Sequence, residues 1–351
     1  MRRFPPERII CLTEETVETL YLLGEQDRIV GVSGYAVRPP QVRREKPRVS
    51  AFTSADLPKI LALDPDLVLT FSDLQAVIVA DLVRAGIAVH AFNHRDVAGI
   101  LAMIRTVGAL VGAGAKAEVL ARGYEARLAQ VAAQAKGELR PRVYFEEWDE
   151  PLISGIGWVS ELVRVAGGED VFPELAAKAA AKDRIVSPEA VIAAAPEVIL
   201  ASWCGKKVVP SRIAGRAGWN RIPAVAQGRI VEIKSPLILQ PGPAALTDGL
   251  DAILQALDRP ASLAEFPNVP VPVPPLTSWP LSEKHRAVLM KVPDEGWIEG
   301  SRIDGRCLDV LLRRGWIRRV HGDGRGRSRG DGYQRTPTAR AALFPDEQPT
   351  A

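Results

Sequence analysis

Cysteine is scarce in this sequence, which has three in 351 residues, namely Cys11, Cys204 and Cys307. The three lie far apart, and none belongs to a CxxC pair. This spacing argues against a zinc site built from thiolates and gives no sign of a fold that depends on disulfides. Hydrophobic residues make up 47% and charged residues 25% of the chain, which is typical of a globular protein and excludes a disordered or collagen-like one.

Long hydrophobic runs are also missing. No apolar stretch reaches the roughly 18–20 residues that a membrane helix needs, so we expect no direct insertion into a membrane. Pro5, Pro6, Glu7 and Arg8 interrupt the apolar segment that a signal peptide would require. We therefore expect a cytoplasmic protein from the chain as given, and a periplasmic one if an upstream start restores an export signal.

Catalytic signatures are absent as well, since the chain contains no HExxH, GxSxG or P-loop motif. Histidine occurs four times. His90 sits inside an apolar segment, where a buried structural histidine is expected, whereas His94 follows that segment and is a candidate to approach a metal. We predict a protein that is not an enzyme, with no catalytic residue, no metal site and no cofactor acting as a catalyst.

The sequence does contain an internal repetition. Residues 59–73, KILALDPDLVLTFSD, read as the end of a helix, a turn at a proline and an apolar strand. Residues 190–204, AVIAAAPEVILASWC, repeat that order. Repetition of this kind predicts two related α/β lobes, which we place at residues 1–95 and 138–260.

The segment between the lobes, residues 96–137, has no proline and carries apolar residues at helical spacings, such as Ile100, Ile104 and Val107. It predicts a linking helix, about 60 Å long if continuous at 1.5 Å per residue. Gly112 and Gly114 are places where such a helix could kink or break.

The C-terminal part differs in composition. Residues 261–277 are rich in proline, which favours an extended, semi-rigid linker. Residues 278–345 follow the order helix, helix, strand, loop, strand, helix, which resembles a small winged-helix domain. Residues 302–340 hold 11 Arg and 4 Asp. This basic segment predicts either contact with the phosphates of a nucleic acid or a solvated loop on a protein-interaction domain.

The apolar strands are short and nearly continuous, as in Leu67–Phe71, Ala88–Phe92 and Val198–Ser202, a pattern typical of parallel strands buried on both faces. Ligands of such sheets bind beyond the carboxyl ends of the strands. Aromatic residues, which are only 6% of the chain, gather there and favour a flat, partly apolar ligand held between the lobes. The candidate ligand-binding residues are Glu14, Tyr35, Phe71, Asp73, Glu147, Trp148, Trp158, Trp203 and Gln240.

Each candidate also has a structural interpretation. A single aromatic residue at a strand end often serves packing alone, and Glu14 and Glu15 are equally consistent with first-turn residues that complement a helix dipole. Glu146 and Glu147 stand side by side before Trp148. Two like charges at a strand end are costly unless they are solvated or paired.

Several segments occur in an order that resembles the cobalamin-binding class of substrate-binding proteins of ABC importers. Over residues 7–258 they are RIICLTEETVETLYLLGEQDRIVGVSGY, LPKILALDPDLVLTF, EEWDEPLISGIGWVSELVRVAGGEDVF, SPEAVIAAAPEVILASWC and SPLILQPGPAALTDGL. The resemblance implies an α/β fold of class III periplasmic-binding-protein type, with two Rossmann-like lobes joined by a long helix. It also implies a corrinoid in the cleft, bound as ligand, with no protein ligand to cobalt.

The resemblance also implies roles for particular residues. Tyr35 matches the tyrosine that contacts the corrin, and Phe71 occupies a position that is often aromatic. Trp148, Trp158 and Trp203 fall in segments of the second lobe that face the cleft.

In transport members of the class, one glutamate on each lobe docks to arginines of the permease. Glu189 matches the second-lobe glutamate. The first-lobe position holds Pro58, with Asp56 nearby, which departs from the pattern.

The leading hypothesis is therefore a two-lobed protein that binds cobalamin or a related corrinoid, with an ABC permease as a possible partner. Two alternatives remain. One keeps the lobes and changes the ligand to haem or a ferric siderophore, which related members bind. The other is a ligand-responsive regulator whose basic C-terminal domain binds nucleic acid.

Overall fold

A computed structural model describes residues 4–260 and, further along, residues 283–294, 296, 298–299, 302–303, 307–308, 311, 316–321, 332–336 and 343. The chain divides into two compact units, Met1–Val269 and Pro270–Ala351. That division falls within the proline-rich stretch at 261–277, which itself lies outside the described residues.

The first lobe contains a five-stranded parallel sheet in the order β3-β2-β1-β4-β5. Its strands and helices are β1 (Ile9–Cys11), α1 (Glu14–Leu22), η1 (Gln26–Arg28), β2 (Ile29–Ser33), α2 (Val42–Glu45), β3 (Arg48–Ser50), α3 (Leu57–Ala62), β4 (Leu67–Phe71), η2 (Asp73–Gln75), α4 (Ala76–Arg84) and β5 (Val89–Phe92).

The central strands of this sheet are buried on both faces, as their continuous apolar sequence predicts. Successive side chains of a strand point to opposite faces, so Ile9 and Cys11 enter one core while Ile10 enters another. Strand β5 departs from the prediction. It lies at the edge of the sheet, and Phe92 is its one buried residue.

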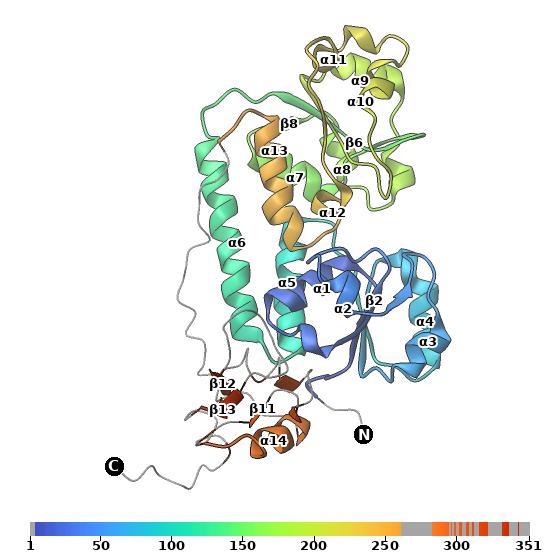
Figure 1. Cartoon of the computed structure of the whole chain (residues 1–351). Coiled ribbons are helices and arrows are strands. Elements are labelled where there is room, and N and C mark those ends of the chain that lie inside the picture. Colours follow the sequence, from blue (N-terminus) through green and yellow to red (C-terminus); the bar gives the residue numbers. More distant parts are fainter. Residues whose placement is uncertain are drawn as a thin grey trace. The chain divides into compact units, whose positions relative to one another are not determined.

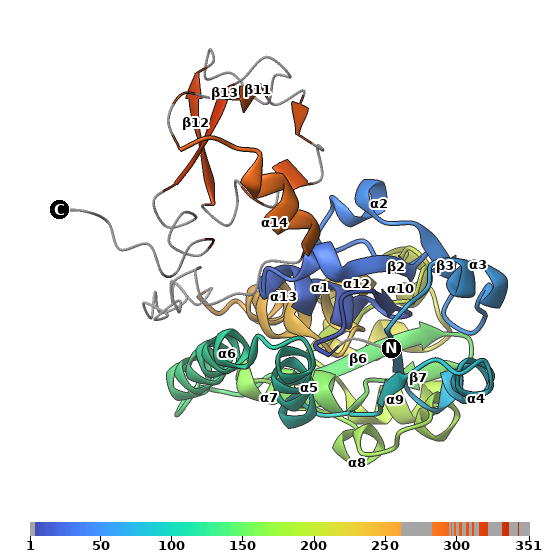
Figure 2. The same ribbon diagram turned by 90° about the horizontal axis from the view of Figure 1, so that it is seen from below.

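The linking segment forms two helices, α5 (Val97–Leu110) and α6 (Gly114–Gln134), so the expectation of one continuous 60 Å helix is wrong. The helices lie side by side in Figures 1 and 2, and their contacts are those of a hairpin. Gly112 turns the chain between them with φ of +74°, a conformation that favours glycine. At Gly108 a Cβ would lie 2.2 Å from the Ala117 Cβ, so only glycine permits this close packing.

The second lobe contains the strand order β10-β9-β6-β7, with β8 paired to β6. All pairs are parallel except β6 with β7. Its elements are β6 (Arg142–Asp149), β7 (Leu152–Ser154), α7 (Gly157–Val165), β8 (Glu169–Asp170), α8 (Pro173–Ala176), η3 (Ala181–Arg184), α9 (Pro188–Ala194), β9 (Val198–Ala201), α10 (Pro210–Ala214), η4 (Trp219–Arg221), α11 (Pro223–Ala226), β10 (Ile230–Glu232), α12 (Ser235–Ile238), the π-helix η5 (Ala245–Gly249) and α13 (Leu250–Ala256).

One hydrophobic core runs through both lobes. It joins Ile9 and Leu69 of the first sheet to Val143 and Leu200 of the second through α1, α5, α6, α7 and α13. Figure 1 shows these helices beside the two sheets. Because moving one lobe against the other would disturb this shared close packing, the helical layer holds the two sheets at a set angle.

The C-terminal unit has a described helix α14 (Glu283–Met290) and an antiparallel sheet in the order β11-β13-β12. Its strands are β11 (Ile298–Glu299), β12 (Ile317–His321) and β13 (Gly332–Arg335). Leu289, Leu311, Trp316 and Tyr333 form its core. Much of the basic segment 302–340, including residues 322–331, lies outside the described residues, and the winged-helix assignment stays a prediction.

Candidate ligand cleft between the lobes

The carboxyl ends of both sheets are where the sequence placed the ligand. In the first sheet, β1 and β4 are neighbours. From β1 the chain continues to β2 on one side of this pair, and from β4 it continues to β5 on the other side. The crevice of such a sheet opens where these directions diverge. Glu14, the first residue of α1 after β1, and Phe71, at the end of β4, stand on its two sides.

A seam of polar contacts joins this edge to the second lobe. The Gln240 side chain lies close enough to the Glu14 carboxylate to lower its pKa, against the larger effect of burial. His94 Nε2 lies 2.9 Å from the Pro241 carbonyl oxygen, which can only accept, so that nitrogen carries the proton. The Ala244 N–H donates to Glu18 Oε2 at 3.0 Å. Two of the candidates, Glu14 and Gln240, are therefore brought together.

The carboxyl groups of the seam are held away from water. Burial, and to a smaller extent the neighbouring Glu14 charge, raises the pKa of Glu15 to about 8. The hydrogen bond that Thr13 Oγ1 donates to Glu15 acts in the opposite direction but is outweighed. Burial likewise raises the pKa of Glu14 and of Glu18. Burial also lowers the pKa of His94. At neutral pH, Glu15 and His94 are thus both neutral, which suits a dry contact between lobes.

An aromatic and cationic cluster closes the other end of the first-lobe edge. The Phe71 and His94 rings meet edge to face, with centroids 5.2 Å apart. The Arg95 guanidinium lies 4.8 Å from the Phe71 centroid, and its Nη2 lies 3.2 Å from Asp73 Oδ1. Phe71 and Asp73 therefore share Arg95, which the sequence analysis did not select although it directly follows His94.

The second lobe faces this cluster with a buried ion pair. Arg184, 1% exposed, donates from both terminal nitrogens to Glu147, at 2.6 and 2.9 Å. Burial, and to a smaller extent the charge of Arg184, lowers the pKa of Arg95, so the second-lobe arginine acts on the first-lobe one. Burial, and to a smaller extent the charges of Glu14 and Glu147, raises the pKa of the Cys204 thiol, so carboxylates of both lobes act on it.

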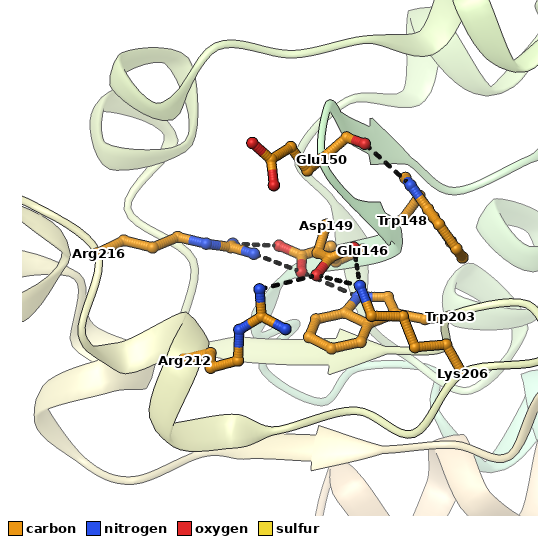
Figure 3. A network of polar contacts seen from close by, with 8 residues as sticks. All are labelled: Glu146, Trp148, Asp149, Glu150, Trp203, Lys206, Arg212 and Arg216. Carbon is orange, nitrogen blue, oxygen red and sulfur yellow. Dashed lines mark hydrogen bonds and ion pairs between the residues drawn. The ribbon is translucent and has the colours of Figure 1, made fainter.

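The adjacent carboxylates of Glu146 and Glu147 each pair with a different arginine. Glu146 is fully buried and receives Arg216 Nη1 and Nη2 at 2.5 and 2.9 Å and Trp203 Nε1 at 3.1 Å (Figure 3). Because adjacent residues of a strand face opposite sides, Glu147 meets Arg184 instead. Both carboxylates are paired, as the sequence argument requires.

The predicted aromatic residues occupy different settings. Tyr35 is 49% exposed and follows β2, so its ring is open to a ligand. Trp148 is half-buried, with Lys206 Nζ 5.1 Å from its ring centroid. Trp158 and Trp203 are 3% and 1% exposed. Their indole N–H groups donate to the Ile238 carbonyl and to Glu146.

Trp158 and Trp203 are therefore almost fully buried in this structure, and their contact with a ligand stays a prediction. Trp158 lies in the first turn of α7, and its backbone N–H donates to the Arg95 carbonyl at 2.9 Å, so it packs where the lobes meet. Trp203 belongs to the core on the outer face of the second sheet, with Trp219 and Tyr144. Both rings pack within hydrophobic clusters of the lobes.

Within the described residues, no group of three or more His, Cys, Asp or Glu side chains is placed to hold a metal ion. Over the same part of the chain, no helix is long and apolar enough to cross a membrane.

Known proteins resemble the N-terminal unit. The cobalamin-binding protein of Halobacterium salinarum (strain R1) is 24% identical over 245 residues, and this chain spans just under two thirds of it, 66%, using 68% of its own length. The vitamin B12-binding protein of Vibrio parahaemolyticus is 28% identical over 250 residues, 70% of this chain and 88% of that protein. Neither relative points to a nucleic acid as partner.

Solved structures show the same fold. The periplasmic vitamin B12 binding protein BtuF of Vibrio cholerae superposes with a TM-score of 0.60 at 24% identity, over 73% of this chain and 98% of that one. The periplasmic haem-binding protein RhuT from Roseiflexus sp. RS-1 superposes with a TM-score of 0.62 at 25% identity, over 71% and 98%. These two proteins bind different tetrapyrroles, so the fold does not choose between them.

The periplasmic binding protein family matches residues 9–237, which include both sheets. The chain therefore belongs to this family.

Proposed function

We propose that this protein binds cobalamin or a related corrinoid in the cleft between its lobes, as the substrate-binding component of an ABC-type uptake system. The curated relatives that bind cobalamin or vitamin B12 support this choice of ligand. The chemistry of the cleft supports it too, because a corrin is a broad, partly apolar disc with amide groups on its rim.

The engagement of His94 is the observation that carries the proposal. Its Nε2 is held 2.9 Å from the Pro241 carbonyl, and burial lowers its pKa. This histidine is therefore part of the seam between lobes and is not free to bind an iron atom. Cobalamin suits such a cleft because its own nucleotide base supplies an axial ligand, so the metal needs none from the protein.

The remaining candidate residues can contact different parts of the corrin. The exposed Tyr35 ring and the half-buried Trp148 ring can cover apolar faces of the corrin. Glu14, Asp73 and Gln240 can hydrogen-bond to its amides. Ligand contact by these side chains is a proposal that rests on their placement at the carboxyl ends of the strands.

Calorimetric titration of the full chain tests the proposal, with cyanocobalamin, haemin and ferrichrome each added separately. We expect sub-micromolar binding to cyanocobalamin. Tyr35→Ala should weaken that binding about tenfold, because an aromatic contact of this kind contributes on the order of 1 kcal/mol beyond its buried area. The control is Phe4→Ala, which removes an exposed ring at 81% exposure outside the cleft. Absence of cyanocobalamin binding would reject the corrinoid.

Haem is the second candidate, and one observation favours it. Tyr35 exposes its phenol at the cleft edge, and a tyrosine oxygen can serve as an axial ligand of haem iron. Tyr35→Phe separates the two ligands. It keeps the ring and should leave corrinoid affinity within twofold, whereas an iron–phenolate bond and its charge-transfer absorption band would be lost.

Docking to a permease is proposed through acidic residues on the two lobes. Glu189 is exposed in the first turn of α9, which Ser187 caps by accepting from the Ala190 N–H at 3.1 Å. On the first lobe Asp56 accepts from the Lys59 N–H as the cap of α3. Asp56 is thereby fixed beside Pro58, where the family pattern expects a glutamate. Glu189→Lys should reduce uptake while ligand binding by the isolated protein stays unchanged.

A further inference from the structure

A cavity of about 240 Å³ lies at the carboxyl ends of β9 and β10 in the second lobe. Trp203 stands at one side of it, and the segment from Ile233 to Pro236 stands at the other. The charged side chains that line it are Lys206, Lys207, Glu232 and Lys234. Three lysines against one glutamate leave the cavity with an excess of two positive charges.

The cavity lies at the same edge of the second sheet as Trp148, one of the predicted ligand-binding residues. Strands β6, β9 and β10 run parallel, so Trp148 near the end of β6 and the cavity beyond β9 and β10 share the carboxyl edge of the sheet. Lys206, which lines the cavity, has its Nζ 5.1 Å from the Trp148 ring centroid. A ligand covered by the Trp148 ring can therefore extend a side group into the cavity.

Two of the lysines are held in place by partners. Lys206 Nζ lies 2.7 Å from Asp149 Oδ2 and between two indoles, 4.9 Å from the Trp203 centroid and 5.1 Å from that of Trp148 (Figure 3). Lys234 Nζ lies 2.7 Å from Glu232 Oε2. Each ion pair orients its lysine. Because an ammonium group has three N–H donors, each lysine can still donate to another acceptor.

Lys207 is different. In the described part of the chain, it has no carboxylate within ion-pairing distance, and it is exposed. Its charge nevertheless helps to lower the pKa of Glu232, so it stands close to the Glu232–Lys234 pair. The cavity therefore combines two oriented cations with one that is unpaired.

We propose that this cavity binds an oxyanion, a phosphate or a carboxylate, carried on the rim of the ligand in the cleft, with Lys207 as its principal partner. This inference rests on the proposed function and narrows its ligand to tetrapyrroles that carry an acidic side group. Lys206 and Lys234 donate further hydrogen bonds to the oxyanion, and Trp203 gives the cavity a rigid wall.

Titration of the full chain with three ligands tests this. Cyanocobalamin carries a phosphodiester, dicyanocobinamide is the same corrin without it, and haemin carries two carboxylates. The variants are Lys207→Ala and, as a matched control that removes an exposed lysine elsewhere in the unit, Lys136→Ala. Each titration is made at 50 and 500 mM NaCl, because salt screens an exposed charge.

We expect Lys207→Ala to weaken binding of whichever acidic tetrapyrrole the protein takes by about fivefold at 50 mM salt, with a smaller effect at 500 mM. Cobinamide affinity and the Lys136→Ala variant should stay within twofold of wild type. A cyanocobalamin effect identifies the phosphate as the source of the anion, and a haemin effect identifies the carboxylates. The proposal would be overturned if Lys207→Ala bound cyanocobalamin and haemin with wild-type affinity, or if it lost as much affinity for cobinamide as for cyanocobalamin. Either result would leave tetrapyrrole binding itself intact.

If none of the three ligands binds, the proposed function fails, and pyrophosphate then serves as the probe of the cavity alone. Binding to wild type and to Lys136→Ala, weakened in Lys207→Ala, would uphold the anion site. No difference between Lys207→Ala and wild type would overturn it.

Discussion

Replacing Glu15 by Gln should make this protein more stable at neutral pH. Glu15 is 2% exposed, and burial together with the Glu14 charge raises its pKa from the ordinary 4.5 to about 8. The folded state thus keeps a proton that the unfolded chain releases above pH 4.5. Since the folded state binds more protons, stability must fall as the pH rises from about 4.5 to about 8.

The size of this effect follows from the same pKa. Between pH 4.5 and pH 8, each pH unit removes about 1.4 kcal/mol from the free energy of unfolding. At pH 7 the loss is about 3 kcal/mol. Glutamine is neutral in both states and can still accept the hydrogen bond from Thr13. Glu15→Gln should therefore exceed wild type by about 3 kcal/mol at pH 7 and match it at pH 4.

Urea unfolding followed by circular dichroism, at pH values from 4 to 8.5, measures this difference. The control is Glu174→Gln, which removes an exposed carboxylate from α8 and should leave the pH dependence as it is. An unchanged pH slope in Glu15→Gln, or a variant less stable than wild type at pH 7, would show that Glu15 is ionised in the folded protein. The argument for a dry seam would then fail.

Two further predictions concern the same seam. At Gly242 a Cβ would lie 2.5 Å from the Glu15 Cβ, so Gly242→Ala should lower stability by about 1–3 kcal/mol through overpacking. Gly114→Ala, which meets nothing within 4 Å, should be neutral or stabilising, and equal melting temperatures for the two variants would contradict this. Burial lowers the pKa of His94, so its contribution to stability is lost as the pH falls below about 6.5. In urea unfolding, His94→Gln should reduce the fall in the free energy of unfolding below pH 6.5. An unchanged fall would mean that His94 does not titrate in that range.

Local patterns were enough for the strands and their turns. The apolar run Leu67–Phe71 is strand β4 with the predicted bounds, and the repeated helix-turn-strand order recurs in α9 and β9. These features depend on residues close together in sequence, so the sequence carries them directly. The edge position of β5 could not be predicted in this way, because exposure of a strand depends on its neighbours in the sheet.

The break of the linking segment into two helices could be predicted only in part from the local sequence. Glycines marked possible breaks, but a hairpin rather than a kink follows from the close approach of Gly108 to Ala117 on the partner helix. Likewise, the sequence required that Glu146 and Glu147 be paired or solvated. It could not name Arg216 and Arg184 as the partners, because those lie 70 and 37 residues away.

The sequence by itself determined the two-lobed α/β architecture, the family and the strand ends that border the cleft, because alternation, turn chemistry and motif order are local properties of the chain. Only the tertiary structure decided which side chains at those ends remain open. It buried Trp158 and Trp203, left Tyr35 exposed and joined His94 to Pro241 across 147 residues. Burial and pairing arise when distant segments pack together, and local pattern does not specify that packing.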